Sequence, residues 1–136
     1  MSGKAFLDTN VLLYLLSSAA AKADRAEQLV AAGGVISVQV LNEFAATAIR
    51  KARLSWPEVA QALEAVRASC AVEPLTLETH DTGRALAMRY GFSVYDAMIV
   101  ASSLLAGASV LYSEDLQDGQ RVEGRLTIRN PFVRPR

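Results

Sequence analysis

Four acidic residues that lie far apart in the chain each adjoin a short apolar segment. They are Asp8 in KAFLDTNVLLYLL, Glu43 in ISVQVLNEFAATAIR, Asp96 in FSVYDAMIVASSLLAG and Asp115 in ASVLYSEDLQDG. A carboxylate next to a hydrophobic core is costly unless it is paired or bound to a metal ion. If the four converge, they form a site for a hard divalent cation such as Mg²⁺ or Mn²⁺, because these ions prefer oxygen ligands.

The charge of such a cluster determines the chemistry that it supports. Carboxylates gathered in a partly buried pocket repel one another, so without a cation at least one of them has a raised pKa. A bound magnesium or manganese ion relieves this repulsion, binds phosphate oxygens and lowers the pKa of a bound water. No histidine or cysteine adjoins the four acids, which excludes a zinc site. The pattern therefore indicates hydrolysis of phosphodiester bonds.

The elements that must position these acids alternate between strand and helix. Buried strands are predicted at residues 4–7, 35–38, 71–75, 109–112 and 126–129, and helices at 11–16, 22–32, 41–52, 55–69, 76–90 and 93–105. This alternation favours an α/β fold with a mainly parallel sheet of about five strands and helices on both faces. Ligands of such sheets bind beyond the carboxyl ends of the strands, and all four acids are predicted to lie at that edge.

Each acid also has an ordinary structural explanation. Asp8 could close an Asx-turn, and Asp96 could complete a helix capping box. Glu43 could lie on a helix surface, while Asp115 and Asp118 stand in a glycine-containing loop where acids are common. Each residue alone is weak evidence, but four acids at one sheet edge are less easily explained in this way.

The composition predicts a single globular domain over residues 1–136. Of the residues, 51% are hydrophobic and 21% are charged, which is typical of a chain with one substantial core. No apolar run reaches the roughly 18 residues of a membrane span, and the N-terminus lacks the pattern of a signal peptide. The one cysteine, Cys70, cannot form an internal disulfide and is expected to be buried at a helix end. We therefore expect a cytoplasmic protein that does not engage a membrane.

Charge is unevenly distributed along the chain, although the net charge is zero. Residues 1–118 hold nine Lys and Arg against thirteen Asp and Glu, whereas residues 119–136 hold five Arg against one Glu. The basic end could be a solvated tail. It could also border the acidic site and receive a polyanion such as nucleic acid.

The four acidic motifs resemble those of the PIN-domain family. Residues 8–12, DTNVL, are similar to the opening motif of that family, and Glu43 in LNEF, Asp96 in YDAMIVASSL and Asp115 in LYSEDL match its later motifs in order and spacing. The resemblance covers essentially the whole chain. It is closest to the VapC-type toxin ribonucleases of bacterial toxin–antitoxin systems.

This resemblance implies a PIN-like three-layer sandwich and an endoribonuclease that depends on Mg²⁺ or Mn²⁺. Asp8, Glu43, Asp96 and Asp115 would be both the catalytic residues and the metal ligands, and Asn10 and Ser113 match positions that support the site. It further implies an RNA substrate, a homodimer and a cognate antitoxin as protein partner. The last motif reads SEDLQDG and not the usual Thr-x-Asp-x-Asp-Phe, so Asp115, Asp118 or both could reach the metal. We favour Asp115, which is nearer the strand end.

Two other classes of protein fit part of the pattern. One is a PIN-fold protein that binds RNA or regulates without turnover, and the four acids argue against it. The other is a receiver-type signalling domain, which also places aspartates and magnesium at the edge of a parallel sheet. That class needs a lysine at a strand end, and Lys4, Lys22 and Lys51 are badly placed for this role.

Overall fold

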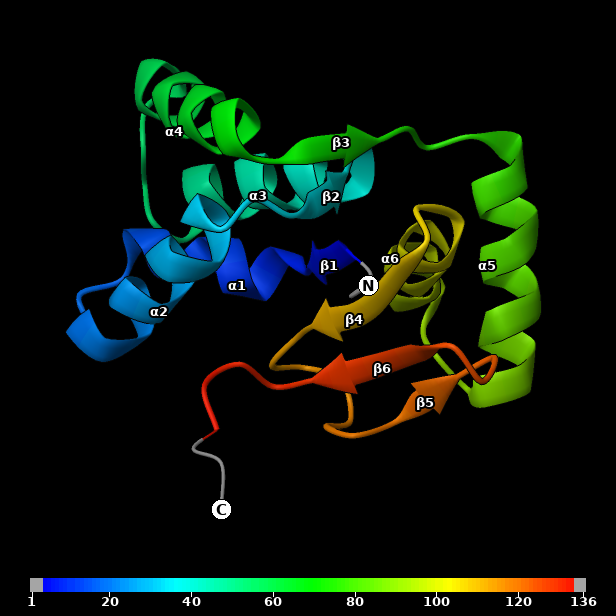
Figure 1. The fold of residues 1–136 in the computed structure, drawn as a ribbon. Coiled ribbons are helices and arrows are strands. Elements are labelled where there is room, and N and C mark those ends of the chain that lie inside the picture. Colours follow the sequence, from blue (N-terminus) through cyan, green and yellow to red (C-terminus); the bar gives the residue numbers. More distant parts are fainter. Residues whose placement is uncertain (1–3, 134–136) are drawn as a thin grey trace.

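A six-stranded sheet forms the centre of the protein in this computed structural model, which describes residues 4–133 (Figure 1). The strands lie in the order β3-β2-β1-β4-β6-β5, and all neighbouring pairs are parallel except β5 and β6. The predicted mainly parallel α/β fold is therefore confirmed. The strands are β1 Lys4–Leu7, β2 Val35–Ser37, β3 Ala71–Glu73, β4 Ala108–Tyr112, β5 Arg121–Val122 and β6 Leu126–Arg129.

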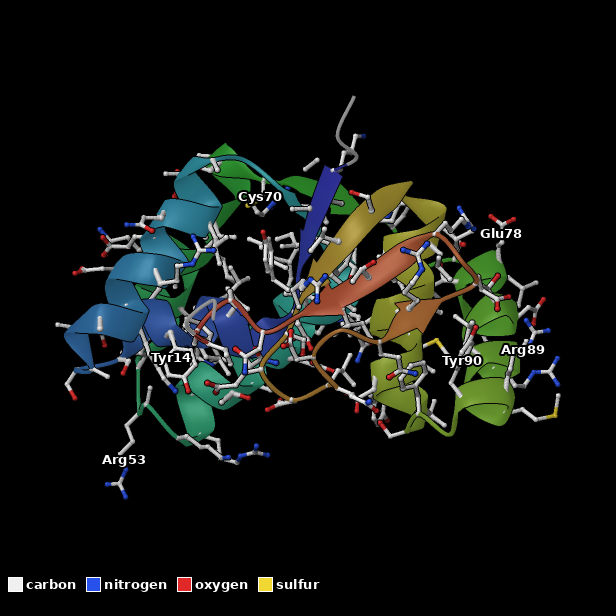
Figure 2. All side chains as sticks on the ribbon, turned by 60° about the horizontal axis from the view of Figure 1, so that its bottom comes forward. Tyr14, Arg53, Cys70, Glu78, Arg89 and Tyr90 are labelled. Carbon is white, nitrogen blue, oxygen red and sulfur yellow. The ribbon has the colours of Figure 1, made fainter. Side chains whose placement is uncertain are left out.

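The edge strand β5 was not expected from the sequence, because it is only two residues long. It pairs with β6 as a short hairpin. A cluster at the end of α5 (Leu77–Tyr90) holds the loop of this hairpin: Arg89 contacts the Glu123 carboxylate at 2.7 Å, and the Tyr90 hydroxyl donates to it at 2.8 Å. Figure 2 shows both side chains beside the hairpin. These contacts join residues 33 and 34 positions apart, so no local pattern predicts them.

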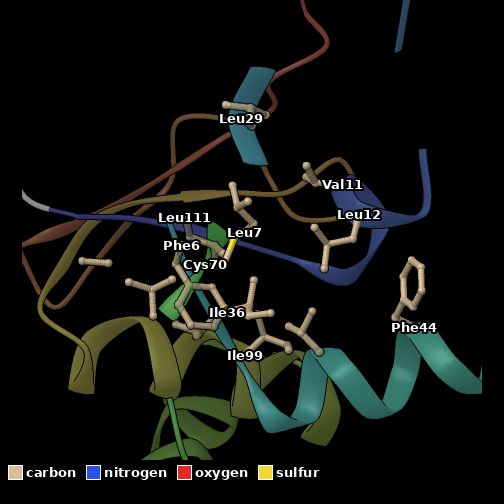
Figure 3. Close-up of a cluster of buried hydrophobic side chains, with 14 of the residues drawn as sticks. Phe6, Leu7, Val11, Leu12, Leu29, Ile36, Phe44, Cys70, Ile99 and Leu111 are labelled. Atoms are coloured by element: carbon tan, nitrogen blue, oxygen red, sulfur yellow. The ribbon is translucent and has the colours of Figure 1, made fainter. Parts of the chain in front are cut away.

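Helices cover both faces of the sheet. In the close-up of the core, Leu29 lies on one side of the strands, whereas Ile99 and Phe44 lie on the other (Figure 3). All three are buried, as are Phe6 and Leu111 of the central strands. The remaining helical segments are α1 Thr9–Leu13, the 3-10 helix η1 Tyr14–Leu16, α2 Ala20–Ala31, α3 Val38–Arg50, α4 Trp56–Ser69 and α6 Val94–Leu105.

Several predicted boundaries differ from the structure by one to three residues, and two strand ends have clear local reasons. The strand predicted at 35–38 ends at Ser37, whose side chain accepts the Val40 amide at 3.2 Å and begins α3 three residues earlier than expected. The strand predicted at 71–75 ends at Glu73, because Pro74 cannot donate to a sheet ladder. The capping box at Ser55 and the helix stop at Gly91, where φ is 79°, occur as predicted.

Helix α6 is buried on most of its circumference, as its apolar sequence predicts. Eight of its twelve residues are buried. Within residues 4–133, no helix combines the length and apolar character that crossing a membrane requires. Cys70 is buried at the end of α4, and this burial raises the pKa of its thiol. A protonated thiol is a poor nucleophile, which agrees with the predicted structural role.

Two adjacent buried serines of α6 provide a matched test of how an unsatisfied hydroxyl affects stability. Ser102 and Ser103 are both 0% exposed, but only Ser103 donates its hydroxyl, to the Ile99 carbonyl at 3.0 Å; the Ser102 hydroxyl has no partner among the described residues. Ser102→Ala should therefore raise the free energy of unfolding by about 1 kcal/mol, because it removes an unsatisfied buried polar group. Ser103→Ala should not raise it. Urea denaturation measures both, and equal effects would contradict the prediction.

Candidate active site

The site begins where the central strands β1 and β4 end. The Asp8 amide donates to the Tyr112 carbonyl at 3.0 Å, so the residues that follow the two strands lie side by side. Asp8 is the N-cap of α1, and its Oδ1 accepts the Thr9 amide at 2.7 Å. Its Oδ2 accepts the Ser113 hydroxyl at 2.8 Å and the Asn10 side-chain amide at 3.2 Å.

Burial of Asp8 dominates the electrostatics of the site. Only 5% of the residue is exposed. This desolvation is the main reason that the pKa of Asp8 is raised from 3.8 to about 6. The hydrogen bonds from Ser113 and Thr9 lower the pKa, while the charges of Asp96 and Glu43 raise it further. A buried carboxylate with no cationic partner and with negative neighbours is stabilised when a cation binds beside it.

Glu43 lies on α3 and is held by two donors. The Thr9 hydroxyl donates to Oε1 at 2.7 Å, and the Gln39 side-chain amide donates to Oε2 at 2.8 Å. Neither Thr9 nor Gln39 was predicted from the sequence to belong to the site. The spacing of Gln39 and Glu43 on a helix, four residues apart, is a signal that could have indicated their contact.

Asp96 stands in the first turn of α6. Its amide donates to the Ser93 hydroxyl at 3.2 Å, but its carboxylate does not return a bond to the Ser93 amide, so only half of the predicted capping box forms. Partial burial raises the pKa of Asp96, the Ser93 side chain lowers it, and the charges of Asp115 and Glu43 raise it. Capping therefore does not fully account for this acid.

Asp115 lies in the loop after β4 and is the most exposed of the four acids. Its Oδ2 accepts the Asn10 side-chain amide at 3.3 Å, and its amide donates to the Ser113 hydroxyl at 3.2 Å. Asp118 is directed elsewhere, because its Oδ1 accepts the Asn130 amide at 2.9 Å. Asn10 thus joins the start of α1 to the loop after β4 through hydrogen bonds to Ser113 and Asp115.

The structure brings all four acids into one cleft of about 360 Å³ at the carboxyl edge of the sheet. Asp118 does not line this cleft. The lining residues are Asp8, Thr9, Asn10, Leu13, Glu43, Ala46, Thr47, Arg50, Asp96 and Asp115.

The donor set fits a hydrated hard cation. Within residues 4–133, no three Asp, Glu, His or Cys side chains are arranged so that they could hold one ion directly. Magnesium commonly binds through one or two carboxylates and retains several waters, so pairs of these acids with bridging water suit it. The lining residues are rich in oxygen ligands and include no histidine or cysteine, which suits Mg²⁺ or Mn²⁺ better than zinc.

The described part of the basic C-terminal segment, residues 119–133, does not line the cleft. Arg121 donates to the Gly124 carbonyl, and Arg125 donates to the Leu104 carbonyl at 3.4 Å. Neither residue, nor Arg129, lines the cleft. Arg134 and Arg136 lie outside the described residues. The alternative in which these cations border the acidic site is therefore not supported, and the cation that does line the cleft is Arg50.

Fold and site together define an α/β domain with an acidic cleft at the carboxyl ends of parallel strands. A family model described as the PIN domain matches residues 5–121, and the chain belongs to this family. The predicted family is confirmed, and the receiver-type alternative does not apply. A comparison with curated proteins finds no match.

Several solved structures share the fold. The VapC20 toxin of Mycobacterium tuberculosis, described as cleaving the sarcin-ricin loop, has a TM-score of 0.65 and 23% identity over 82% of this chain and 89% of that chain. A toxin-antitoxin complex from Klebsiella pneumoniae has a TM-score of 0.71 and 21% identity over 94% of this chain and 98% of that chain. DNA-bound VapBC from Salmonella typhimurium has a TM-score of 0.70 and 21% identity over 96% of this chain and 99% of that chain.

Proposed function

We propose that this PIN-domain protein is a Mg²⁺- or Mn²⁺-dependent endoribonuclease and the toxin of a VapBC-type pair. The observation that carries the proposal is the convergence of Asp8, Glu43, Asp96 and Asp115 in one cleft. The fold shared with VapC toxins supports the choice of RNA as substrate.

Pairs of the four carboxylates would hold the metal ion together with bridging water, and neighbouring polar side chains would orient the carboxylates. Ser113 and Asn10 hold Oδ2 of Asp8, while Thr9 fixes Glu43 by its hydroxyl. A bound divalent ion would supply a water of lowered pKa and neutralise charge on the phosphoryl group. These supporting hydrogen bonds exist without the ion, so they orient Asp8 and Glu43 before it binds.

The direct test is cleavage of labelled RNA with magnesium, with manganese and with a chelator. We expect products only with added metal, and no product from Asp8→Ala under any of the three conditions. The competing hypothesis, a PIN-fold protein that binds RNA without turnover, predicts RNA binding that is insensitive to metal and no product from any substrate. Cleavage that continues at full rate in the chelator would contradict the metal-dependent mechanism.

We also propose that a cognate antitoxin binds the chain and that the chain forms a homodimer. The structures from Klebsiella pneumoniae and Salmonella typhimurium are toxin–antitoxin assemblies. An apolar groove of about 330 Å³ between η1, α2, α3 and α4, lined by Leu15, Leu16, Val30 and Phe44 among others, suits a helix of such a partner. Co-expression with the product of a short reading frame upstream of the gene, followed by light scattering, tests both associations.

A further inference from the structure

Arg50 alone is cationic among the described residues that line the acidic cleft. It is exposed and stands in the last turn of α3. Although four carboxylates line the same cleft, no described acid forms an ion pair with Arg50, and no described residue hydrogen-bonds to its side chain. Its guanidinium is therefore available to an anion from solution.

Because Arg50 stands at the end of α3, an anion that it binds would lie at one side of the cleft, away from the four carboxylates. Glu43 and Arg50 are seven residues apart, and Ala46 and Thr47 between them also line the cleft. Residues at this spacing share one face of a helix. Seven residues correspond to about 10 Å along the helix axis, so one wall of the cleft carries an acid at one end and a cation at the other.

The chain beyond Arg50 extends the same positive surface. Lys51 and Arg53 are exposed and form no ion pair with a described acid. Arg53 has φ of 57°, a left-handed conformation that favours glycine, and Figure 2 shows its side chain extending away from the protein. Interaction with the helix dipole accounts for a cation in the last turn. It does not account for a cation inside the acidic cleft or for an arginine at a position that favours glycine.

We propose that Arg50 binds a backbone phosphate of the RNA adjacent to the phosphate that is cut. This inference rests on the proposed function and assigns the path of the substrate, from the acids toward the end of α3. A guanidinium binds phosphate through paired hydrogen bonds. A polyanion that enters a cleft lined by carboxylates also requires positive charge near its path. Because this phosphate does not react, its contact should affect KM and leave kcat nearly unchanged.

Arg50→Ala is expected to raise KM about tenfold, with kcat within about twofold of the wild type. The probe is a pool of labelled random-sequence RNAs, from which the sequence that the wild type cuts best is selected for kinetics in magnesium. Loss of one phosphate contact should also reduce the slope of log KM against log salt concentration by about 0.7. Arg50→Lys should recover part of the loss, because it keeps the charge.

Arg67→Ala is the matched control. Arg67 is likewise exposed, stands in the last turn of a helix and forms no ion pair with a described acid, but it lies on α4 and does not line the acidic cleft. Both variants lose the same interaction with a helix dipole, so equal changes in Tm are expected. Only Arg50→Ala should change KM and its salt dependence.

A second measurement locates the contact on the RNA. In the selected sequence, each phosphate near the cut is replaced in turn by an uncharged methylphosphonate. At one uncut position the replacement should raise KM for the wild type and for Arg67→Ala, but not for Arg50→Ala. If the replacements act equally on all three proteins, or if KM of Arg50→Ala equals that of Arg67→Ala, the inference is overturned while the proposed function stands. If the wild type cuts no RNA in the pool, the proposed function fails and the inference with it.

Discussion

Asp96→Asn is expected to reduce RNA cleavage about 10³-fold, the loss that follows removal of one well-placed electrostatic group from an active site. The substitution preserves shape and removes one negative charge from the cleft. The fold should be retained, because the Asp96 amide still donates to the Ser93 hydroxyl and begins α6. The measurement is kcat/KM for a defined RNA in magnesium, together with circular dichroism and thermal unfolding of both proteins.

Asp118→Asn is the control for this substitution. It makes the same chemical change in the loop after β4, at an acid that does not line the cleft. An asparagine oxygen can still accept the Asn130 amide that Asp118 accepts now, so activity and stability should stay close to the wild type. Normal cleavage by Asp96→Asn, or an equal loss in both variants, would show that the acids of the cleft do not carry the reaction.

Hydrophobic periodicity and capping residues were sufficient to predict the main architecture. The strand at residues 4–7 and the capped helix from Ser55 lie where the pattern places them. Such elements can be predicted because the residues that specify them lie within the element or directly beside it in the sequence. The strand β5 is not, because its two residues depend on pairing with β6 and on the contacts of Glu123 with α5.

The acids of the site could be located from the sequence, but their partners could not. Parallel strands bring their carboxyl ends together, so residues that follow β1 and β4 must be neighbours wherever they stand in the chain. The hydrogen bond from Thr9 to Glu43 and the entry of Arg50 into the cleft depend instead on how α3 packs against α1. Local patterns do not specify this packing, which is why both residues were missed.

In the metal-free protein, Asp8 is expected to lower the free energy of unfolding by about 2 kcal/mol between pH 4 and pH 7. Its pKa is about 6 in the folded state against 3.8 for an ordinary aspartate. Below pH 3.8 the carboxyl is protonated in both states, so burying it places no charge in the core. Between pH 3.8 and pH 6 the unfolded state ionises while the folded state still holds its proton, so stability falls, and the loss is nearly complete above pH 6. Urea denaturation in chelator across this range measures the change.

Comparison with Asp8→Asn isolates this contribution from that of other carboxyls. Glu114 and Glu123 have lowered pKa values, and they contribute stability that is lost as pH falls, which opposes the effect of Asp8. An asparagine can still accept the Thr9 amide but cannot ionise. The difference in free energy of unfolding between the wild type and Asp8→Asn should therefore change steadily from pH 4 to pH 7, as the wild type loses the contribution of Asp8. Parallel curves would show that the Asp8 carboxyl is not desolvated in the folded protein.

A divalent cation should abolish this pH dependence. An ion bound beside Asp8 favours the charged form and lowers its pKa, so with saturating manganese the stability of the wild type should stay nearly constant between pH 5 and pH 7, where the metal-free protein loses stability. At 100 times its dissociation constant, such an ion adds about 2.7 kcal/mol. Asp8→Asn should gain much less, because it lacks the charge that the ion neutralises. An equal gain in both proteins would show that manganese binds elsewhere and that Asp8 does not hold it.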